Sequence, residues 1–207
     1  MIEFFINAYK EASTTQIILE FTAFVFGILS VWFARKENIW VYPIGLIATI
    51  ITTYLFFIKG FLGDMMINAY FAIMSIYGWY KWARKKNQKK ALSITRTNRK
   101  EKMIGIVLFF VTIFVVFGIY NFFGNEIKNE NYIDILASGI FFTAMWYMAN
   151  KKIENWILWI FGDIILVPIL AYRGLGILSL QYLIFTILAV SAYLEWKKIL
   201  NKKGQAV

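Results

Sequence analysis

The stretch Met103–Phe123 reads MIGIVLFFVTIFVVFGIYNFF, a run of 21 residues without a charged side chain. A helix that crosses the hydrocarbon core of a bilayer needs about 20 such residues, so this stretch predicts a membrane-spanning helix. The rest of the chain has the same character, because 60% of its 207 residues are hydrophobic and only 16% are charged. A soluble protein of this size would lack the polar side chains needed to cover its surface.

Six further segments meet the same length requirement. They are 17–34, 40–58, 63–80, 132–149, 156–172 and 175–194. We therefore expect an all-α integral membrane protein with seven transmembrane helices, folded as a single membrane domain over 1–207. The segment 1–16 carries Phe4, Phe5 and Tyr9 and predicts a short interfacial helix.

Lysine and arginine are divided unevenly between the two sides that seven spans create. Four of the 22 fall on one side, at Lys10, Lys59, Lys128 and Arg173, and the other 18 fall on the opposite side. The positive-inside rule then predicts an external N-terminus and a cytoplasmic C-terminus. The largest group lies in the loop 83–102. We interpret it as a topology determinant that touches lipid headgroups, with a regulatory or nucleic-acid role as the alternative.

The two halves of the chain resemble each other at a spacing of 114 residues. The matched pairs are Lys59 and Arg173, Gly60 and Gly174, and Trp82 and Trp196. We therefore expect two three-helix repeats, 17–82 and 132–196, which the connecting helix 103–123 places in the same orientation. This 3+1+3 plan with parallel repeats is typical of transporters, whose substrate site lies near the midplane at the repeat interface. A chance likeness between two apolar three-helix units is the alternative.

The chain contains no histidine and no cysteine. Disulfides, most zinc sites, cysteine nucleophiles and histidine bases are thereby excluded. We expect a protein that binds and moves its substrate, without enzyme activity, a cofactor or a metal.

The sixth span begins with a polar and aromatic face. Asn155, Trp159 and Asp163 recur every four residues and therefore share one side of a helix. Asp163 is the most deeply placed ionisable residue, and such residues within a membrane are usually functional. A structural hydrogen bond to a neighbouring helix is its alternative role. Trp156 flanks this face, where an ordinary interfacial aromatic belt would also place it.

The third and seventh spans add further candidates. Aromatic walls with a few amides and a carboxylate suit a planar, positively charged heteroaromatic ring, although a simple sugar would also stack on tryptophan. Besides the four residues of the sixth span, the candidate substrate-binding residues are Asn68, Ser75, Tyr77, Trp79, Trp82, Gln181 and Tyr182.

Two motifs, taken together and in their order along the chain, resemble a specific family of membrane proteins. They are Tyr77-Gly78-Trp79-Tyr80-Lys81-Trp82 and Glu154-Asn155-Trp156-Ile157-Leu158-Trp159, followed by Gly174 and Gln181-Tyr182. Over 21–196 the chain resembles the nicotinamide riboside transporter family, the PnuC-like vitamin transporters. The resemblance implies a fold similar to that of the SWEET sugar transporters and a location in a bacterial inner membrane. It further implies a homo-oligomer, namely a trimer. It also implies facilitated diffusion of nicotinamide riboside, a vitamin B3 precursor for NAD biosynthesis, with trapping by cytoplasmic phosphorylation.

Other functions remain open at this point. Related subfamilies carry thiamine or riboflavin. An integral-membrane enzyme would use Asp64 and Asp163 for acid–base or metal chemistry. A channel is the third possibility. Because neither a histidine relay nor a helix with paired carboxylates is evident, we expect a uniporter that uses no ion gradient.

Overall fold

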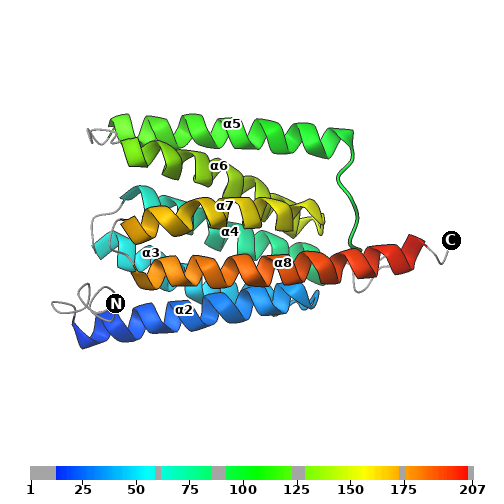
Figure 1. The fold of residues 1–207 in the computed structure, drawn as a ribbon, viewed down its shortest axis with the longest axis horizontal. Helices are drawn as coiled ribbons and strands as arrows, with labels where there is room; N and C mark the ends of the chain where they lie inside the picture. The colour runs from blue at the N-terminus through cyan, green and yellow to red at the C-terminus, as the bar shows by residue number, and fades with distance from the viewer. Residues whose placement is uncertain (1–12, 59–61, 85–91, 123–128, 173–175, 205–207) are drawn as a thin grey trace.

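The computed structural model describes residues 13–58, 62–84, 92–122, 129–172 and 176–204, and these residues form seven long α-helices (Figure 1). The helices are α2 (Thr14–Arg35), α3 (Val41–Ile58), α4 (Leu62–Arg84), α5 (Arg99–Phe122), α6 (Asn129–Ala149), α7 (Glu154–Tyr172) and α8 (Gly176–Gly204). They overlap the seven predicted segments and confirm the all-helical fold, although α8 continues ten residues past the predicted end at 194. The interfacial helix predicted over 1–16 lies mostly outside the described residues.

Six of the seven helices are long and apolar enough to cross a membrane on their own composition. The exception is α4, whose 23 residues include Asn68, Lys81 and Arg84. This helix nevertheless runs alongside the others through the bundle (Figure 1). The protein is therefore a multi-pass membrane protein, and α4 reaches the bilayer as part of the bundle and not through its own hydrophobicity.

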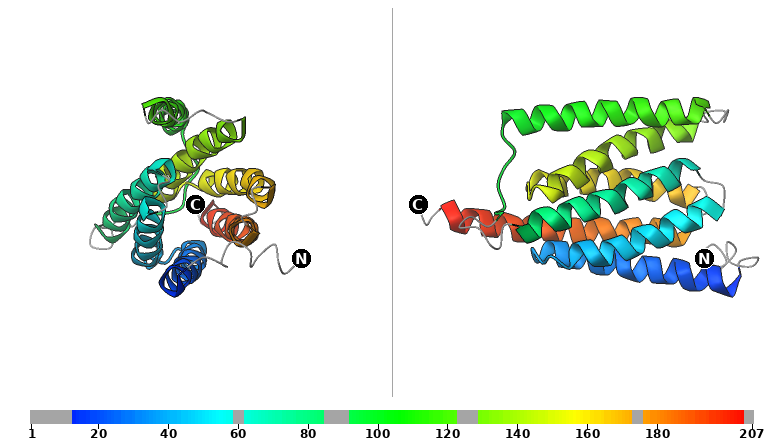
Figure 2. Two further views of the ribbon diagram at one scale, coloured as in Figure 1. Left: turned by 90° about the vertical axis from the view of Figure 1, so that its left-hand side faces the viewer. Right: turned by 180° about the vertical axis from the view of Figure 1, so that it is seen from behind.

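Packing divides the helices into two groups of three and one outlier. In the first triplet α3 packs between α2 and α4, and in the second triplet α7 packs between α6 and α8. The triplets meet where α4 packs on α6 and where α2 packs on α8, so the six helices close into a ring. We call these two contacts between the triplets the seams. If α2, α3 and α4 are exchanged with α6, α7 and α8, the α4–α6 seam maps onto the α8–α2 seam, as two parallel repeats would require. Helix α5 lies outside the ring against α6 (Figure 2).

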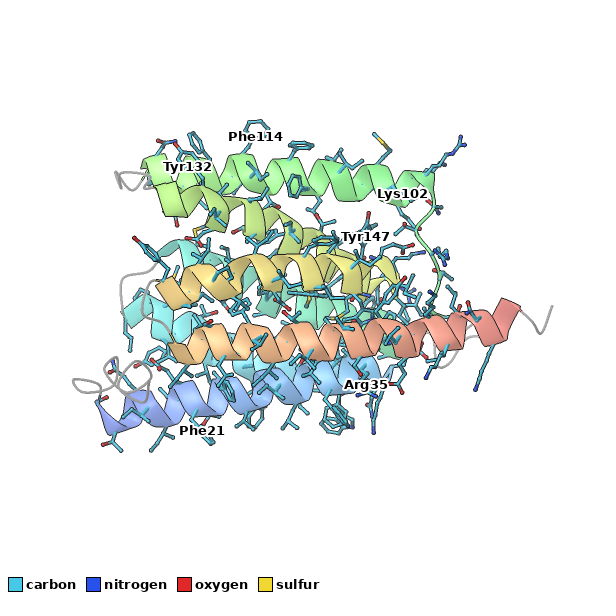
Figure 3. The ribbon with its side chains drawn as sticks, viewed as in Figure 1. Phe21, Arg35, Lys102, Phe114, Tyr132 and Tyr147 are labelled. Carbon is cyan, nitrogen blue, oxygen red and sulfur yellow. The ribbon has the colours of Figure 1, made fainter. Side chains whose placement is uncertain are left out.

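The lysines and arginines gather at one end of the bundle. Within the part of the chain that the structure describes, every one of them lies at the end where α2, α4, α6 and α8 finish. Arg35 and Lys102 mark this basic end, whereas Phe21 and Phe114 point outward from opposite sides of the bundle (Figure 3). Phe114 is 72% exposed, which suits a side chain that faces lipid.

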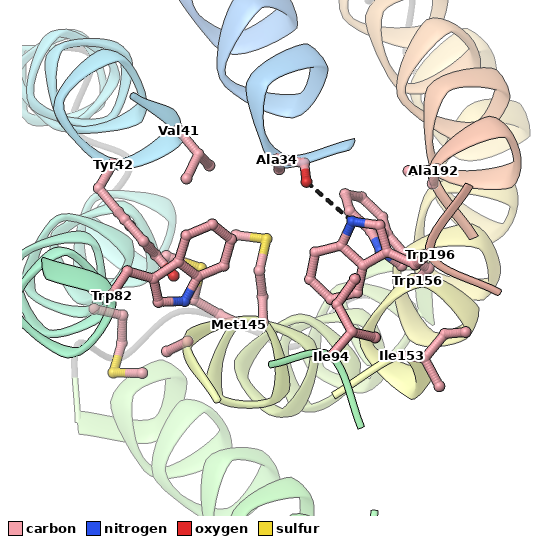
Figure 4. Close-up of a cluster of buried hydrophobic side chains, with 14 residues drawn as sticks. Ala34, Val41, Tyr42, Trp82, Ile94, Met145, Ile153, Trp156, Ala192 and Trp196 are labelled. Carbon is pink, nitrogen blue, oxygen red and sulfur yellow. Dashed lines mark hydrogen bonds between the residues drawn. The ribbon is translucent and has the colours of Figure 1, made fainter. Parts of the chain in front are cut away.

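The largest group of buried apolar side chains lies close to this end. We call it the basic-end cluster; its centre is formed by Trp82, Trp156 and Trp196 (Figure 4). The Trp196 indole N–H donates to the carbonyl oxygens of Ala34 and Arg35, each 3.2 Å away, and so joins α8 to α2 across the seam between the triplets. A second, smaller cluster, which includes Phe141 and Leu170, lies farther along the bundle.

Candidate functional site

One face of α7 combines buried polar groups with an aromatic ring. Asn155 is fully buried, Asp163 is 2% exposed and Trp159 is half-buried. The spacing of four residues predicted that these three side chains share a face, and their burial agrees with that prediction. Asp163 is the tenth of the 19 residues of α7, so its carboxyl group lies halfway along a membrane-spanning helix.

Aromatic rings from four helices gather around this face. Trp159 stacks on Phe141 of α6 with ring centroids 5.2 Å apart, and Phe71 of α4 lies 6.0 Å from the same indole. Tyr182 of α8 lies 6.2 Å from Phe141. We call these four residues the aromatic wall. Because α4 belongs to the first triplet and the other three helices to the second, the wall stands at the interface between the triplets.

Two glycines allow rings to approach helix backbones closely. A Cβ atom on Gly162 would lie 2.3 Å from Cε1 of Phe141, so the ring would have to move to admit any side chain there. Gly162 therefore lets the Phe141 ring lie against α7 beside Asp163. Gly78 does the same for the ring of Tyr42, whose Cε1 would lie 2.2 Å from an added Cβ.

Several buried polar atoms of this region lack a hydrogen-bond partner. Buried polar groups in proteins are nearly always paired, so each exception needs an explanation. Within the described residues they are Tyr42 Oη, Trp82 Nε1, Asn155 Oδ1, Trp156 Nε1 and Trp159 Nε1. The Asn155 amide nitrogen is engaged, because Nδ2 donates to the carbonyl oxygen of Lys152 at 2.6 Å. The α7 face thus offers one free acceptor on Asn155 and one free donor on Trp159.

The one acidic side chain among Asn155, Trp159 and Asp163 is that of Asp163, and it lies away from the basic residues of the described chain. Asp163 is buried at mid-depth, whereas every described lysine and arginine lies at the basic end. A buried carboxylate is costly unless a positive charge lies near it. A cation bound near Asp163 would offset this cost. Among the described residues no three acidic side chains come together as a metal site would require.

Four of the other candidate residues belong to the aromatic wall or are buried. Tyr182 is part of the aromatic wall. Trp82 and Trp156 are buried in the basic-end cluster, and Trp156 lies about one helical turn from Trp159 toward that end. Ser75 is 4% exposed and is buried within α4.

Four further candidates lie away from the α7 face or at its edge. Tyr77 is 39% and Trp79 is 41% exposed, and the Lys81 ammonium lies 5.1 Å from the Tyr77 ring centroid. The candidates on α4 therefore do not share one environment, because Tyr77 and Trp79 are exposed whereas Ser75 and Trp82 are buried. Asn68 and Gln181 are half-buried, and Gln181 faces Gly27 of α2. The Asp64 side chain lies outside the part that the structure describes.

Sequence reasoning missed three aromatic residues of this region. They are Tyr42, Phe71 and Phe141. The 114-residue offset could have indicated Phe71, since it pairs this residue with Phe185, whose ring lies 6.0 Å from that of Tyr182. Neither spacing nor composition singles out Phe141 or Tyr42, because tertiary packing against Gly162 and Gly78 places them.

A comparison with protein families decides what kind of protein carries this site. The family model described as "Nicotinamide mononucleotide transporter" matches residues 17–198. The chain belongs to this family. The resemblance inferred from the two motifs is thereby confirmed, and membership in the nicotinamide mononucleotide transporter family makes the protein a membrane transporter and not an enzyme.

Individual relatives of this family member agree. The nicotinamide riboside transporter PnuC of Escherichia coli K12 is 26% identical over 210 residues, which cover 90% of this chain and 87% of the relative. The transporter of the same name from Shigella flexneri gives the same values. The crystal structure of the vitamin B3 transporter PnuC superimposes with a TM-score of 0.73 at 20% identity, over 97% of this chain and 89% of the other. This last likeness confirms the fold.

Proposed function

We propose that this transporter carries nicotinamide riboside. The observation that supports the proposal is the buried Asp163, which lies one turn along α7 from Trp159, whose indole stacks on Phe141. Nicotinamide riboside carries a positively charged pyridinium ring, which would stack on these rings and lie near the carboxylate. Its carboxamide offers both a donor and an acceptor, which suit the free acceptor of Asn155 and the free donor of Trp159.

The charge distribution favours the riboside over the mononucleotide. A phosphate adds between one and two negative charges, and proteins usually bind it with arginine, lysine or helix N-termini. Every described lysine and arginine lies at the basic end, away from the mid-depth of Asp163. A nucleotide would therefore bring its phosphate toward a buried carboxylate without a compensating cation. The curated relatives named as nicotinamide riboside transporters fit this preference.

The proposed mechanism is alternating access between the two triplets. The aromatic wall draws Phe71 from the first triplet and its other members from the second, so movement at the seams would expose it to either side. We propose uniport by facilitated diffusion, with cytoplasmic phosphorylation trapping the product. The expected location is the bacterial inner membrane, with the basic end and the C-terminus in the cytoplasm and the N-terminus outside.

Thiamine is the second candidate substrate. It is also a cationic heteroaromatic compound, so the carboxylate of Asp163 does not distinguish it from nicotinamide riboside. Riboflavin carries no positive charge and gains nothing from this carboxylate. The carboxamide partners on Asn155 and Trp159 favour nicotinamide riboside over thiamine.

A binding panel with the purified protein tests the proposal. The panel contains nicotinamide riboside, its uncharged reduced form, nicotinamide mononucleotide, thiamine and riboflavin, measured by calorimetry. We expect nicotinamide riboside to bind most tightly and the reduced form at least about tenfold more weakly, the effect of roughly 1.4 kcal/mol. Thiamine binding without nicotinamide riboside binding would refute the substrate and leave the fold unaffected.

Liposome uptake tests the mechanism. Collapse of the proton and sodium gradients by ionophores should leave the initial rate of nicotinamide riboside uptake unchanged. A rate that falls with the gradient would refute uniport. Steady single-channel current, or flux that does not saturate with concentration, would indicate a channel.

Topology and assembly have their own tests. The chain lacks cysteine, so Thr14→Cys and Lys198→Cys each introduce one reactive thiol. We expect an impermeant maleimide to label only the first from outside the cell. We also propose a homotrimer, which light scattering of the protein in nanodiscs would detect as three chains per particle.

A further inference from the structure

The connection between α4 and α5 contains an ordered segment, Leu92–Asn98, which we call the strap. It joins α5, outside the ring, to the basic end of the bundle (Figure 1). The strap ends at α5 with a reciprocal cap, in which the Asn98 N–H donates to the Glu101 carboxylate and the Glu101 N–H donates to Asn98 Oδ1, both at 2.9 Å. Its course is therefore fixed at the α5 side.

The strap is also attached to the turn between α6 and α7. Thr95 and Lys152 form an isolated parallel β-bridge. Within it the Thr95 N–H donates to the Lys151 carbonyl oxygen and the Ile153 N–H donates to the Thr95 carbonyl oxygen, both at 3.1 Å. The Lys152 ammonium donates to Thr95 Oγ1 at 2.9 Å, and the Thr97 N–H donates to the Glu154 carboxylate at 3.0 Å.

One side chain of the strap enters the basic-end cluster. Ile94 is 1% exposed and lies next to Trp196 and Ile153 (Figure 4). All six helices of the ring contribute to this cluster, which therefore closes the interior of the ring at its basic end. Any solute that moves from Trp159 toward this end has to pass through the cluster, so the contacts of Ile94 must part.

The cluster has a feature that a permanent core would avoid. Tyr42 Oη, Trp82 Nε1 and Trp156 Nε1 are buried in it without a hydrogen-bond partner among the described residues. Each unpaired donor raises the free energy of the closed arrangement, because water would satisfy it in an open one. The closure is thus held by packing, by the Trp196–Ala34 hydrogen bond, by the Arg35–Glu195 ion pair and by the hydrogen bonds of the strap, while the unpaired polar groups favour opening.

We propose that the strap is the gate of the basic end: release of the Thr95–Lys152 bridge withdraws Ile94 and lets the cluster open for substrate. This inference rests on the proposed function in one respect only, because it requires that a transported solute leaves through the basic end. It assigns a role in transport to a segment that lies outside the substrate site.

A disulfide across the bridge tests the proposal. Paired strands lie about 4.8 Å apart, within the range that a disulfide spans. The chain has no cysteine of its own, so the double variant Thr95→Cys/Lys152→Cys forms one defined bond, verified by mass spectrometry. We expect oxidation to lower the initial uptake rate about tenfold or more and reductant to restore it, because a gate that cannot open blocks the conformational step of each cycle. Substrate binding should persist in the oxidised protein.

The single variants Thr95→Cys and Lys152→Cys, treated with the same oxidant, set the reference rates. An oxidised double variant that transports as fast as its reduced form overturns the proposal. Equal loss of binding and transport also overturns it, because the strap would then only support the fold. If the double variant fails to fold, labelling of Ile94→Cys by a water-soluble maleimide decides. If labelling becomes faster while substrate is being transported, the result supports the gate. If the labelling rate does not change, the proposal is overturned.

Binding of nicotinamide riboside by the wild-type protein is measured first. If this binding fails, the proposed substrate is wrong. The strap is then tested with whichever vitamin of the panel does bind, so the two failures are distinguishable.

Discussion

Phe141 of α6 and Trp159 of α7 stack with their ring planes 27° apart, and the buried Asp163 follows Trp159 by four residues, about one turn along α7. The packing of α6 against α7 fixes the geometry of the stack. A wall built in advance lowers the entropy lost when a flat ring binds. The backbone of α7 at Gly162 is what permits it, since Phe141 occupies the volume that any larger residue would need.

The first prediction concerns this close approach. Gly162→Ala places a Cβ atom 2.3 Å from Phe141 and should destabilise the protein by about 1–3 kcal/mol, the usual effect of overpacking. Substrate binding should weaken as the Phe141 ring is displaced. Thermal unfolding in detergent and calorimetry measure the two effects.

Gly118→Ala is the matched control. This glycine also lies within a helix, but an added Cβ meets nothing within 4 Å among the described atoms. Alanine is the better helix former by up to about 1 kcal/mol, so this variant should be as stable as the wild type or more stable. Equal destabilisation by both variants would show that the Phe141 contact does not matter.

The second prediction concerns the indole nitrogen of Trp159. Trp159→Phe keeps an aromatic ring in the wall but removes an N–H that has no partner among the described residues. Stability should therefore change little through hydrogen bonding, whereas nicotinamide riboside binding should weaken about tenfold, because the donor would be used only in the complex. Trp40→Phe, at a tryptophan that is 57% exposed, should bind as the wild type does. An unchanged affinity in Trp159→Phe would exclude this contact.

The helices could be predicted from the sequence, because a run of about 20 apolar residues has few alternatives to crossing a membrane. The α7 face could also be predicted, since Asn155, Trp159 and Asp163 lie on a single helix whose period of 3.6 residues relates them directly. Helix α4 shows where this reasoning weakens. Its apolar and polar residues are mixed around the helix, so spacing alone could not tell that Trp79 would be half exposed.

The remaining parts of the site depend on contacts between helices. Phe141 meets Trp159 only because α6 and α7 pack at Gly162, and Tyr42 meets Trp82 at 5.0 Å only because Gly78 admits its ring. No local pattern encodes which ring will fill the space above a glycine. The strap could not be predicted either, since the many basic residues of 83–102 give no sign that Ile94 is buried in the basic-end cluster.

The third prediction concerns the charge of Asp163. Asp163→Asn keeps the shape of the side chain and removes its charge. The variant should bind cationic nicotinamide riboside about tenfold or more weakly and should no longer prefer it to the uncharged reduced form. Calorimetry with both compounds measures the change. Asp134→Asn is the control. Asp134 lies in α6 near the end of the bundle opposite the basic end, so this variant should keep the preference for the cationic form. If Asp163→Asn still prefers cationic nicotinamide riboside to the reduced form, another group must interact with the positive charge.

The fourth prediction compares two tryptophans of the basic-end cluster. Trp196→Phe removes the N–H that links α8 to the carbonyl oxygens of Ala34 and Arg35, and the buried acceptor on Ala34 is left without it. Such a loss costs about 1–3 kcal/mol beyond the effect of the smaller ring. Trp82→Phe also shrinks a buried indole, but its Nε1 has no partner within the described part of the chain. Trp82→Phe should therefore be less destabilising, and thermal unfolding of the two variants measures the difference. If the two melt at the same temperature, the Trp196 hydrogen bond contributes nothing to the closed arrangement, and the two triplets are held together at this end by packing and by ion pairs such as Arg35–Glu195.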